Sequence, residues 1–265
     1  MTGSYKIKPK QWGSPLDVRY AIFKNAERIG IDPASIALAM PMWDTIDYAT
    51  LKTGVNINGC TFVRDGVEIL KTTDATDVQR YIEVQNTDNK IWPLTAVAVI
   101  KPYWQPTGDR YCSIISRGGV FTNNSNFSVG SRVGTNRFYG YYRNGSSLYG
   151  AEDVVNSGNT QLPANRIGVV SYVLSKGSQY YFVGATKYSL DVDNFDPGTY
   201  GGNVRIGGPG VYVSTDTSYP GVILTCFLFN KILSDAIILY LSDNPYYLLQ
   251  RQVPVFYSLS WYQPT

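Results

Sequence analysis

The chain has 265 residues, a formal net charge of +3 and only 16% charged residues. Its 22 tyrosines, 25 glycines and 14 prolines favour strands and tight turns over helices, because aromatic side chains suit a pleated surface and Gly and Pro suit turns. Histidine is absent, which excludes the commonest general base, the usual middle member of a serine triad and the most frequent zinc ligand.

Residues 1–35 are predicted to form an extended basic arm. Pro9, Pro15 and Pro33 interrupt any long helix, although residues 18–30 have room for one or two helical turns. The segment holds six basic and three acidic residues, which accounts for the whole net charge of the chain. We expect such an arm to lie across a partner surface, and a solvated leader is the alternative.

Short strand-like runs separated by Gly, Asn, Asp and Pro clusters begin at residue 36. In residues 95–104 both faces of the run are apolar, which predicts a central strand covered on each side. Lys176 and Gly177 suit the tight turn of a hairpin. About ten such strands predict an all-β, two-sheet antiparallel jelly-roll sandwich over residues 36–250, followed by a tail, 251–265, that packs on the domain or on a neighbour.

One short helix is expected near the end of the domain, over residues 234–242. Ser234 is a good N-cap, and Asn244 with Pro245 ends the helix after about two turns. A helix this short is marginal alone, so it must pack on the sandwich, with Ile238 and Leu241 as the anchoring pair.

The order of these elements resembles the laminin G-like, concanavalin A-like jelly-roll superfamily in the form that bacteriophages encode. The strongest match is the segment from Asn230 to Pro245, which reads NKILSDAIILYLSDNP and is similar to the family's R-x-L-S-D-A-E-I-x-x-L-x-x-N-P. Weaker matches are the leader 9–17, the end of the first strand at 40–44, the strand 92–102 and the stretch 203–208. The resemblance implies a concanavalin A-like sandwich and a place in a phage particle.

Two departures from the family pattern concern the C-terminal helix. Ile237 stands where the family usually has Glu, so the reciprocal bond of a capping box is absent. With Leu239 and Tyr240 the helix is apolar nearly all round, and we expect something to cover its outer side. Either a subunit contact or the segment 251–265 could do so, and the sequence leaves both open.

The sequence contains few residues in the patterns typical of catalytic sites. The four glutamates, Glu27, Glu68, Glu83 and Glu152, are widely separated, so the clustered carboxylates of jelly-roll glycosidases are missing. Cys60, Cys112 and Cys226 stand far apart among apolar or small residues, which predicts buried free thiols without a disulfide framework. We expect a protein that is not an enzyme and that needs no cofactor.

Calcium is a low-ranking possibility. Asp191 and Asp193 lie at i, i+2 in an extended segment, with Asp196 near, and carboxylate oxygens are the ligands that Ca²⁺ prefers. Asp-rich turns are also common for their own backbone hydrogen bonds, which is the simpler explanation.

A glycan site is a second possibility, because sugars are bound by aromatic faces with polar partners nearby. The stretch 139–149 offers the candidates Tyr139, Tyr141, Tyr142, Arg143 and Asn144. Tyrosines on strands more often serve cross-strand packing, which is the alternative. The same aromatics could stack nucleic-acid bases, but without a strongly basic patch we expect no nucleic-acid partner.

The sequence is richer in features of a surface that meets other proteins. Aromatic residues are favoured anchors in interfaces. The predicted assembly contacts are Tyr5, Lys6, Lys8, Lys10, Trp12, Ile237, Leu239, Tyr240, Trp261 and Tyr262. We therefore expect a non-enzymatic structural protein of a bacteriophage virion, which decorates or cements the capsid or forms part of the tail and contacts other virion proteins and copies of itself. The alternative is a carbohydrate-binding, lectin-like module that attaches to host cell-surface glycan.

Neither a membrane nor an export signal is expected. No stretch reaches the roughly 18 consecutive apolar residues of a membrane span. The first twelve residues lack the apolar core of a signal peptide. The predicted location is the virion, after synthesis in the host cytoplasm.

Overall fold

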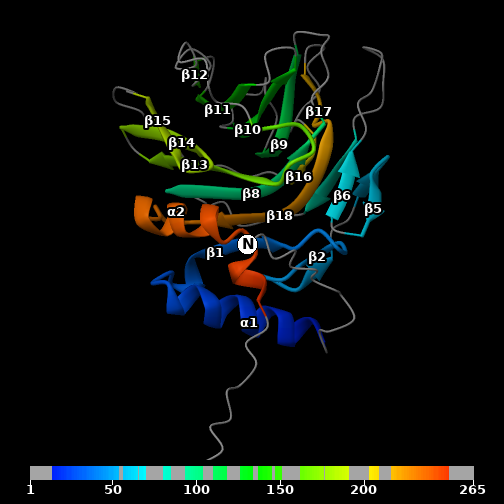
Figure 1. Ribbon diagram of the computed structural model, residues 1–265, viewed down its shortest axis with the longest axis vertical. Coiled ribbons are helices and arrows are strands. Elements are labelled where there is room, and N and C mark those ends of the chain that lie inside the picture. Colours follow the sequence, from blue (N-terminus) through cyan, green and yellow to red (C-terminus); the bar gives the residue numbers. More distant parts are fainter. Residues whose placement is uncertain are drawn as a thin grey trace, which may run out of the picture.

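The computed structural model places the described part of the chain in three layers (Figure 1). The described residues are 14–53, 56–64, 66–69, 80–84, 93–103, 110–117, 126–133, 137–144, 147–150, 162–175, 177–190, 203–208 and 216–250. Two sheets form a sandwich, and two helices lie under the lower sheet of Figure 1.

The middle layer, here called the inner sheet, has eight strands. In spatial order they are β15 (Thr186–Leu190), β14 (Ser178–Val183), β13 (Gly168–Ser175), β8 (Leu94–Pro102), β18 (Gly221–Phe229), β6 (Gly66–Ile69) and β5 (Thr61–Val63), with β1 (Ile36–Met40) also paired to β18. A separate ribbon of β2 (Ile46–Asp47) and β3 (Lys52–Thr53) lies next to β1.

The second layer, here called the outer sheet, also has eight strands. In spatial order they are β12 (Ser147–Gly150), β11 (Arg137–Asn144), β10 (Asn126–Val133), β9 (Arg110–Arg117), β16 (Val204–Ile206), β7 (Tyr81–Val84) and β4 (Asn56–Asn58), with β17 (Asp216–Ser218) also paired to β9. Among the described strands of this sheet, β17 and β9 pair in parallel, and the other pairs are antiparallel. The two-sheet sandwich expected from the sequence is confirmed.

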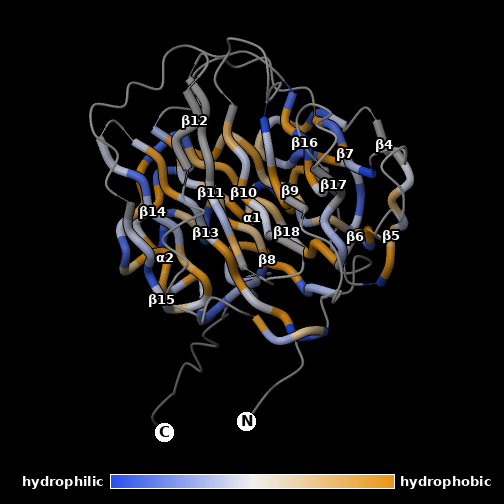
Figure 2. Tube along the Cα trace, turned by 90° about the horizontal axis from the view of Figure 1, so that it is seen from above, coloured by the Kyte–Doolittle hydropathy of each residue, from blue (hydrophilic) through white to orange (hydrophobic). Residues whose placement is uncertain are grey.

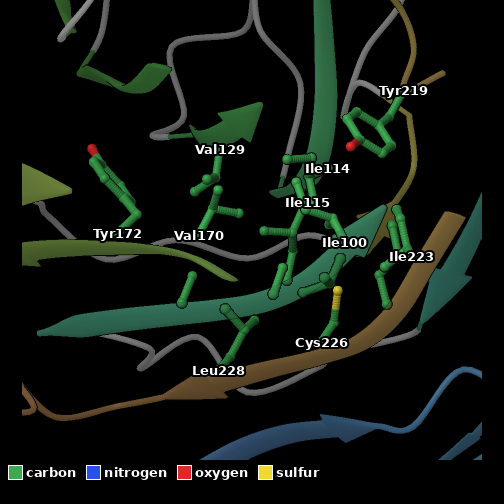
Figure 3. Close-up of a cluster of buried hydrophobic side chains, with 14 of the residues drawn as sticks. Ile100, Ile114, Ile115, Val129, Val170, Tyr172, Tyr219, Ile223, Cys226 and Leu228 are labelled. Atoms are coloured by element: carbon green, nitrogen blue, oxygen red, sulfur yellow. The ribbon is translucent and has the colours of Figure 1, made fainter. Parts of the chain in front are cut away.

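The core of the sandwich lies between the two sheets. In Figure 3, Ile100, Ile223 and Cys226 of the inner sheet face Ile115 and neighbouring side chains of the outer sheet. Figure 2 shows the hydrophobic stretches of β8, β9, β10 and β18 in the middle of the molecule. Burying these side chains contributes roughly 25 cal/mol per Å² of apolar area, which is the main stabilisation of the sandwich.

Strand β8 is buried on both faces, as predicted. Ala96, Ala98 and Ile100 belong to the core between the sheets, whereas Val97 and Val99 belong to a second core under the inner sheet. The hairpin prediction is also confirmed, because Ser175 pairs with Ser178 and Gly177 has the positive φ of 70° that suits a tight turn.

Helices cover the second core, and the prediction for the N-terminal segment is wrong. Residues 1–35 were expected to be an extended arm, but α1 (Pro15–Arg28) is a helix of 14 residues. Pro15 occupies its first turn, where proline is tolerated, and Ser14 and Asp17 form a reciprocal capping box. Val18, Ala21, Ile22 and Ala26 bury one side of this helix against the domain, and η2 (Pro33–Ser35) leads into β1.

The short C-terminal helix is confirmed as α2 (Asp235–Asp243). The Ser234 side chain accepts a hydrogen bond from the backbone N–H of Ile237, and Ile238 and Leu241 are the buried residues of the helix. Leu239, like Ile237, packs partly against the second core. A 3₁₀ turn, η4 (Tyr247–Leu249), follows and packs on α1.

The prediction of buried free thiols is confirmed for Cys112 and Cys226, whereas the free thiol of Cys60 is only half-buried. Burial raises the pKa of the Cys60 thiol to about 11, so it is a poor nucleophile at neutral pH. Among the described helices, neither α1 nor α2 has the length and apolar character needed to cross a bilayer.

Candidate functional site

The outer face of the outer sheet is the candidate surface for a binding site. The inner sheet has a hydrophobic core on each face, one against the outer sheet and one against α1, α2 and η4. In the described part of the chain, no helix lies on the far side of the outer sheet (Figure 1). That face therefore carries the residues of the outer sheet that the sandwich core does not use.

Strands β7 and β16 present charged side chains on this face. In β7, Tyr81 and Glu83 alternate with two buried core residues, and in β16 Arg205 lies between two buried core residues. Because successive side chains of a strand point to opposite faces, all three lie on the outer face. The antiparallel register places Arg205 directly opposite Glu83.

These residues form one hydrogen-bonded group, here called the Arg205 cluster. The Arg205 Nε donates to Glu83 Oε2 at 2.8 Å, and the Asn203 Nδ2 donates to Glu83 Oε1 at 3.0 Å. The Arg205 guanidinium also lies 4.2 Å from the centre of the Tyr81 ring, within cation–π range. The side chains of Arg205 and Glu83 remain 21% and 12% exposed, so solvent reaches both.

The middle of the outer face is packed differently. Ser113 Oγ lies 2.8 Å from Ser128 Oγ and 3.5 Å from Tyr139 Oη, and all three residues are buried. A Cβ on Gly130 would meet Tyr139 Oη at 2.6 Å, so the tyrosine side chain lies directly over this glycine. Tyr139 is 2% exposed, so its assignment as a glycan-binding residue is corrected: its ring serves cross-strand packing.

The other glycan candidates lie in β11, where the structure describes only the backbone. Tyr141 is opposite Ser128, Tyr142 is opposite Phe127 and Arg143 is opposite Asn126. The side chains of these three, and that of Asn144, lie outside the described residues, so their assignment stays a prediction.

The calcium candidates Asp191, Asp193 and Asp196 also lie outside the described residues. Within the described ranges, no group of three or more His, Cys, Asp or Glu side chains is arranged to hold a metal ion.

The predicted assembly contacts divide into two sets. Seven of them, Tyr5, Lys6, Lys8, Lys10, Trp12, Trp261 and Tyr262, lie outside the described residues. Of the three in α2, Ile237 and Leu239 pack against the second core, whereas Tyr240 is 39% exposed and its ring makes an edge contact with Tyr247 at 5.0 Å. The apolar outer side of this helix is thus covered in part from within the chain.

The Arg205 cluster was missed at the sequence level. The alternation of polar and apolar residues in 81–84 and 204–206 places Tyr81, Glu83 and Arg205 on strand faces, and this signal was available. Nothing local indicates that the two strands pair, because Glu83 and Arg205 are 122 residues apart. Glu83 and Arg205 come together because of the order of the strands in the sheet.

Comparisons with known proteins bear on the fold. No family model matches the chain, and no curated protein sequence matches it significantly. Among solved structures, it is similar to Trypanosoma rangeli sialidase in complex with sialic acid, with 11% identity and a TM-score of 0.58 over 81% of this chain and 34% of that one. The chain thus spans about a third of the length of the sialidase chain that it matches.

Two smaller domains are matched over nearly their whole length. One is the CBM40 domain of the Ruminococcus gnavus IT-sialidase, bound to α2,3-sialyllactose, with 14% identity and a TM-score of 0.50 over 66% of this chain and 95% of that one. The other is domain 4 of AbnA, a Geobacillus stearothermophilus arabinanase, in complex with arabinotriose, with 14% identity and a TM-score of 0.56 over 78% and 98%. At such identities the likeness concerns the β-sandwich fold alone.

Proposed function

We propose that this chain is a carbohydrate-binding module whose ligand lies on the outer face of the outer sheet. The observation that carries the proposal is the Arg205 cluster, a solvent-reached group of charged and amide side chains on the sheet face that the described helices leave uncovered. The likeness to two domains whose structures hold oligosaccharides supports it.

The chemistry of the cluster suits sugar hydroxyls. A hydroxyl group both donates and accepts hydrogen bonds, and a guanidinium beside a carboxylate offers donors and acceptors within a few ångströms. Hydrogen bonds to charged groups are stronger than neutral ones, at about 1.5–3 kcal/mol each. Because Glu83 holds Arg205 and is itself held by Asn203, little side-chain entropy is lost when a ligand binds.

A glycan array tests the proposal. We expect the wild-type chain to bind at least one class of glycan, and Arg205→Ala to weaken that binding at least tenfold. Arg28→Ala is the matched control, because Arg28 is exposed in the last turn of α1, on the helical side of the molecule. Equal binding by the Arg205 variant, checked for folding by circular dichroism, would contradict the proposed site.

A second candidate function is that of a structural protein in a bacteriophage particle. It rests on the resemblance of residues 230–245 to phage-type sandwiches and on the outward side of α1, where Leu16 and Tyr20 are 62% and 66% exposed. Exposed aromatic and aliphatic residues on one helix face are suited to protein contacts. The two functions are compatible, since a particle protein can also hold a glycan.

Analytical ultracentrifugation tests this second candidate. If α1 forms a contact between copies, the wild-type chain should self-associate, and the double variant Leu16→Ser/Tyr20→Ser should weaken that association at least tenfold. A wild-type chain that stays monomeric at 100 µM, roughly the concentration at which weak interfaces populate, would count against it.

A further inference from the structure

From the Arg205 cluster we infer, resting on the proposed function, that the ligand is a neutral saccharide and that acidic sugars are rejected. The two ligand-bearing domains of similar fold hold one acidic and one neutral glycan, so the fold does not decide between them. The charges of the Arg205 cluster decide between an acidic and a neutral glycan.

The positive charge of Arg205 is already compensated by Glu83. A ligand carboxylate is best bound by an arginine whose charge and fork are directed at it. Arg205 instead gives its Nε to Glu83 at 2.8 Å, and the pair sums to zero charge. An arriving anion therefore meets a neutral ion pair.

The Glu83 carboxylate also repels an acidic ligand. Glu83 accepts from Arg205 through one oxygen and from Asn203 through the other, which keeps the carboxylate fixed beside Arg205. A ligand carboxylate that reaches Arg205 would thus lie within a few ångströms of a like charge. Both side chains are mostly shielded from water, where such repulsion is screened least.

The aromatic partner of Arg205, Tyr81, also favours a neutral ligand. The Arg205 guanidinium covers one face of the Tyr81 ring at 4.2 Å. Because the guanidinium covers that face of the ring, the cluster offers a sugar hydrogen-bonding groups there more than an aromatic stacking surface. The hydroxyl groups of a neutral sugar ring form hydrogen bonds with these groups without bringing a charge into the cluster.

The test is an array of matched glycan pairs, each neutral oligosaccharide printed with and without a terminal sialic acid; lactose with α2,3-sialyllactose is one such pair. We expect the wild-type chain to bind neutral members at least tenfold more tightly than their sialylated partners. Glu83→Gln keeps the shape of the side chain and removes its charge, and should raise binding of sialylated members at least tenfold.

The matched control is Glu27→Gln, because Glu27 is an exposed glutamate of α1 that is also paired to a cation, Lys24, at 2.7 Å. It should leave the neutral preference unchanged. A wild-type preference for sialylated glycans, or an unchanged preference in Glu83→Gln, would overturn this inference while leaving the proposed function standing. Failure to bind any glycan would instead contradict the proposed function, and this inference with it.

Discussion

Asn25 joins the two ends of the described chain through a single side chain. It is fully buried on α1, and its Nδ2 donates to the backbone carbonyls of Tyr247, Leu248 and Gln250 at 3.1, 3.3 and 2.8 Å. These acceptors belong to or follow η4, so the amide ties the first helix to the last described turn.

Removing this amide should be costly. In Asn25→Ala one buried and two part-buried carbonyls lose their donor, and an unsatisfied buried polar group costs about 1–3 kcal/mol. We expect a loss of that size in the free energy of urea unfolding. Asn25→Asp should be no better, because a carboxylate cannot donate. A loss below about 0.5 kcal/mol, the range of ordinary surface substitutions, would show that the contact does not hold the two ends.

Asp47 of β2 plays a similar part beside β1. Its Oδ1 accepts from the backbone N–H groups of Ala39 and Ala49 at 2.9 and 3.0 Å, and its Oδ2 accepts from Thr50. Burial raises the pKa of this carboxyl above its usual value of 3.8, although the hydrogen bonds oppose that shift.

The direction of this shift predicts a pH dependence. With a folded pKa above the unfolded one, the contribution of Asp47 to stability is fully present below about pH 4 and is lost as pH rises through the folded pKa. Asp47→Asn keeps the acceptor oxygen and removes the charge, so its stability relative to wild type should improve from pH 3.5 upward through this range. Urea unfolding at several pH values measures the difference, and a constant difference would contradict the assignment.

At the scale of elements, α1 is stabilised by its buried side. Ile22 is fully buried in the second core, whereas Tyr20 on the same helix is 66% exposed. Ile22→Ala should therefore cost about 2–5 kcal/mol, from lost burial and the cavity left behind. Tyr20→Ala, the control, should stay within about 0.5 kcal/mol. Thermal melts compare them, and equal effects would mean that α1 does not pack as described.

The same helix shows where sequence reasoning stops. The strand in residues 95–104 and the helix over 234–242 were predicted well, because the apolar pattern of the first and the caps of the second are local signals. Pro15 predicts an interruption of a long helix, yet at the first helical position a proline costs no hydrogen bond, and Ser14 with Asp17 is a capping signal in the sequence. Whether such a segment lies on the domain depends on an uncovered sheet face, which the sequence alone does not reveal.

The candidate site shows the same limit. The tyrosines of β11 were chosen for their composition, but Tyr139 turned out to be buried over a glycine of the neighbouring strand. Arg205 and Glu83 meet only because β16 lies next to β7 in the outer sheet. Pairing between strands far apart in the chain is set by the tertiary fold and leaves no local trace.

At the scale of the whole molecule, each of the three layers has a separate role. The helices cover one face of the inner sheet, the outer sheet covers its other face, and the outer face of the outer sheet carries the Arg205 cluster (Figure 1). A β-sandwich closed in this way has a rigid platform on which a binding site needs few mobile parts.

The measurement that tests this account most directly is a crystal structure of the chain with the glycan that gives the strongest array signal. We predict that the glycan lies on the outer face of the outer sheet, within hydrogen-bond distance of Arg205. A glycan seated on the helical layer instead, away from Arg205 and Glu83, would contradict it.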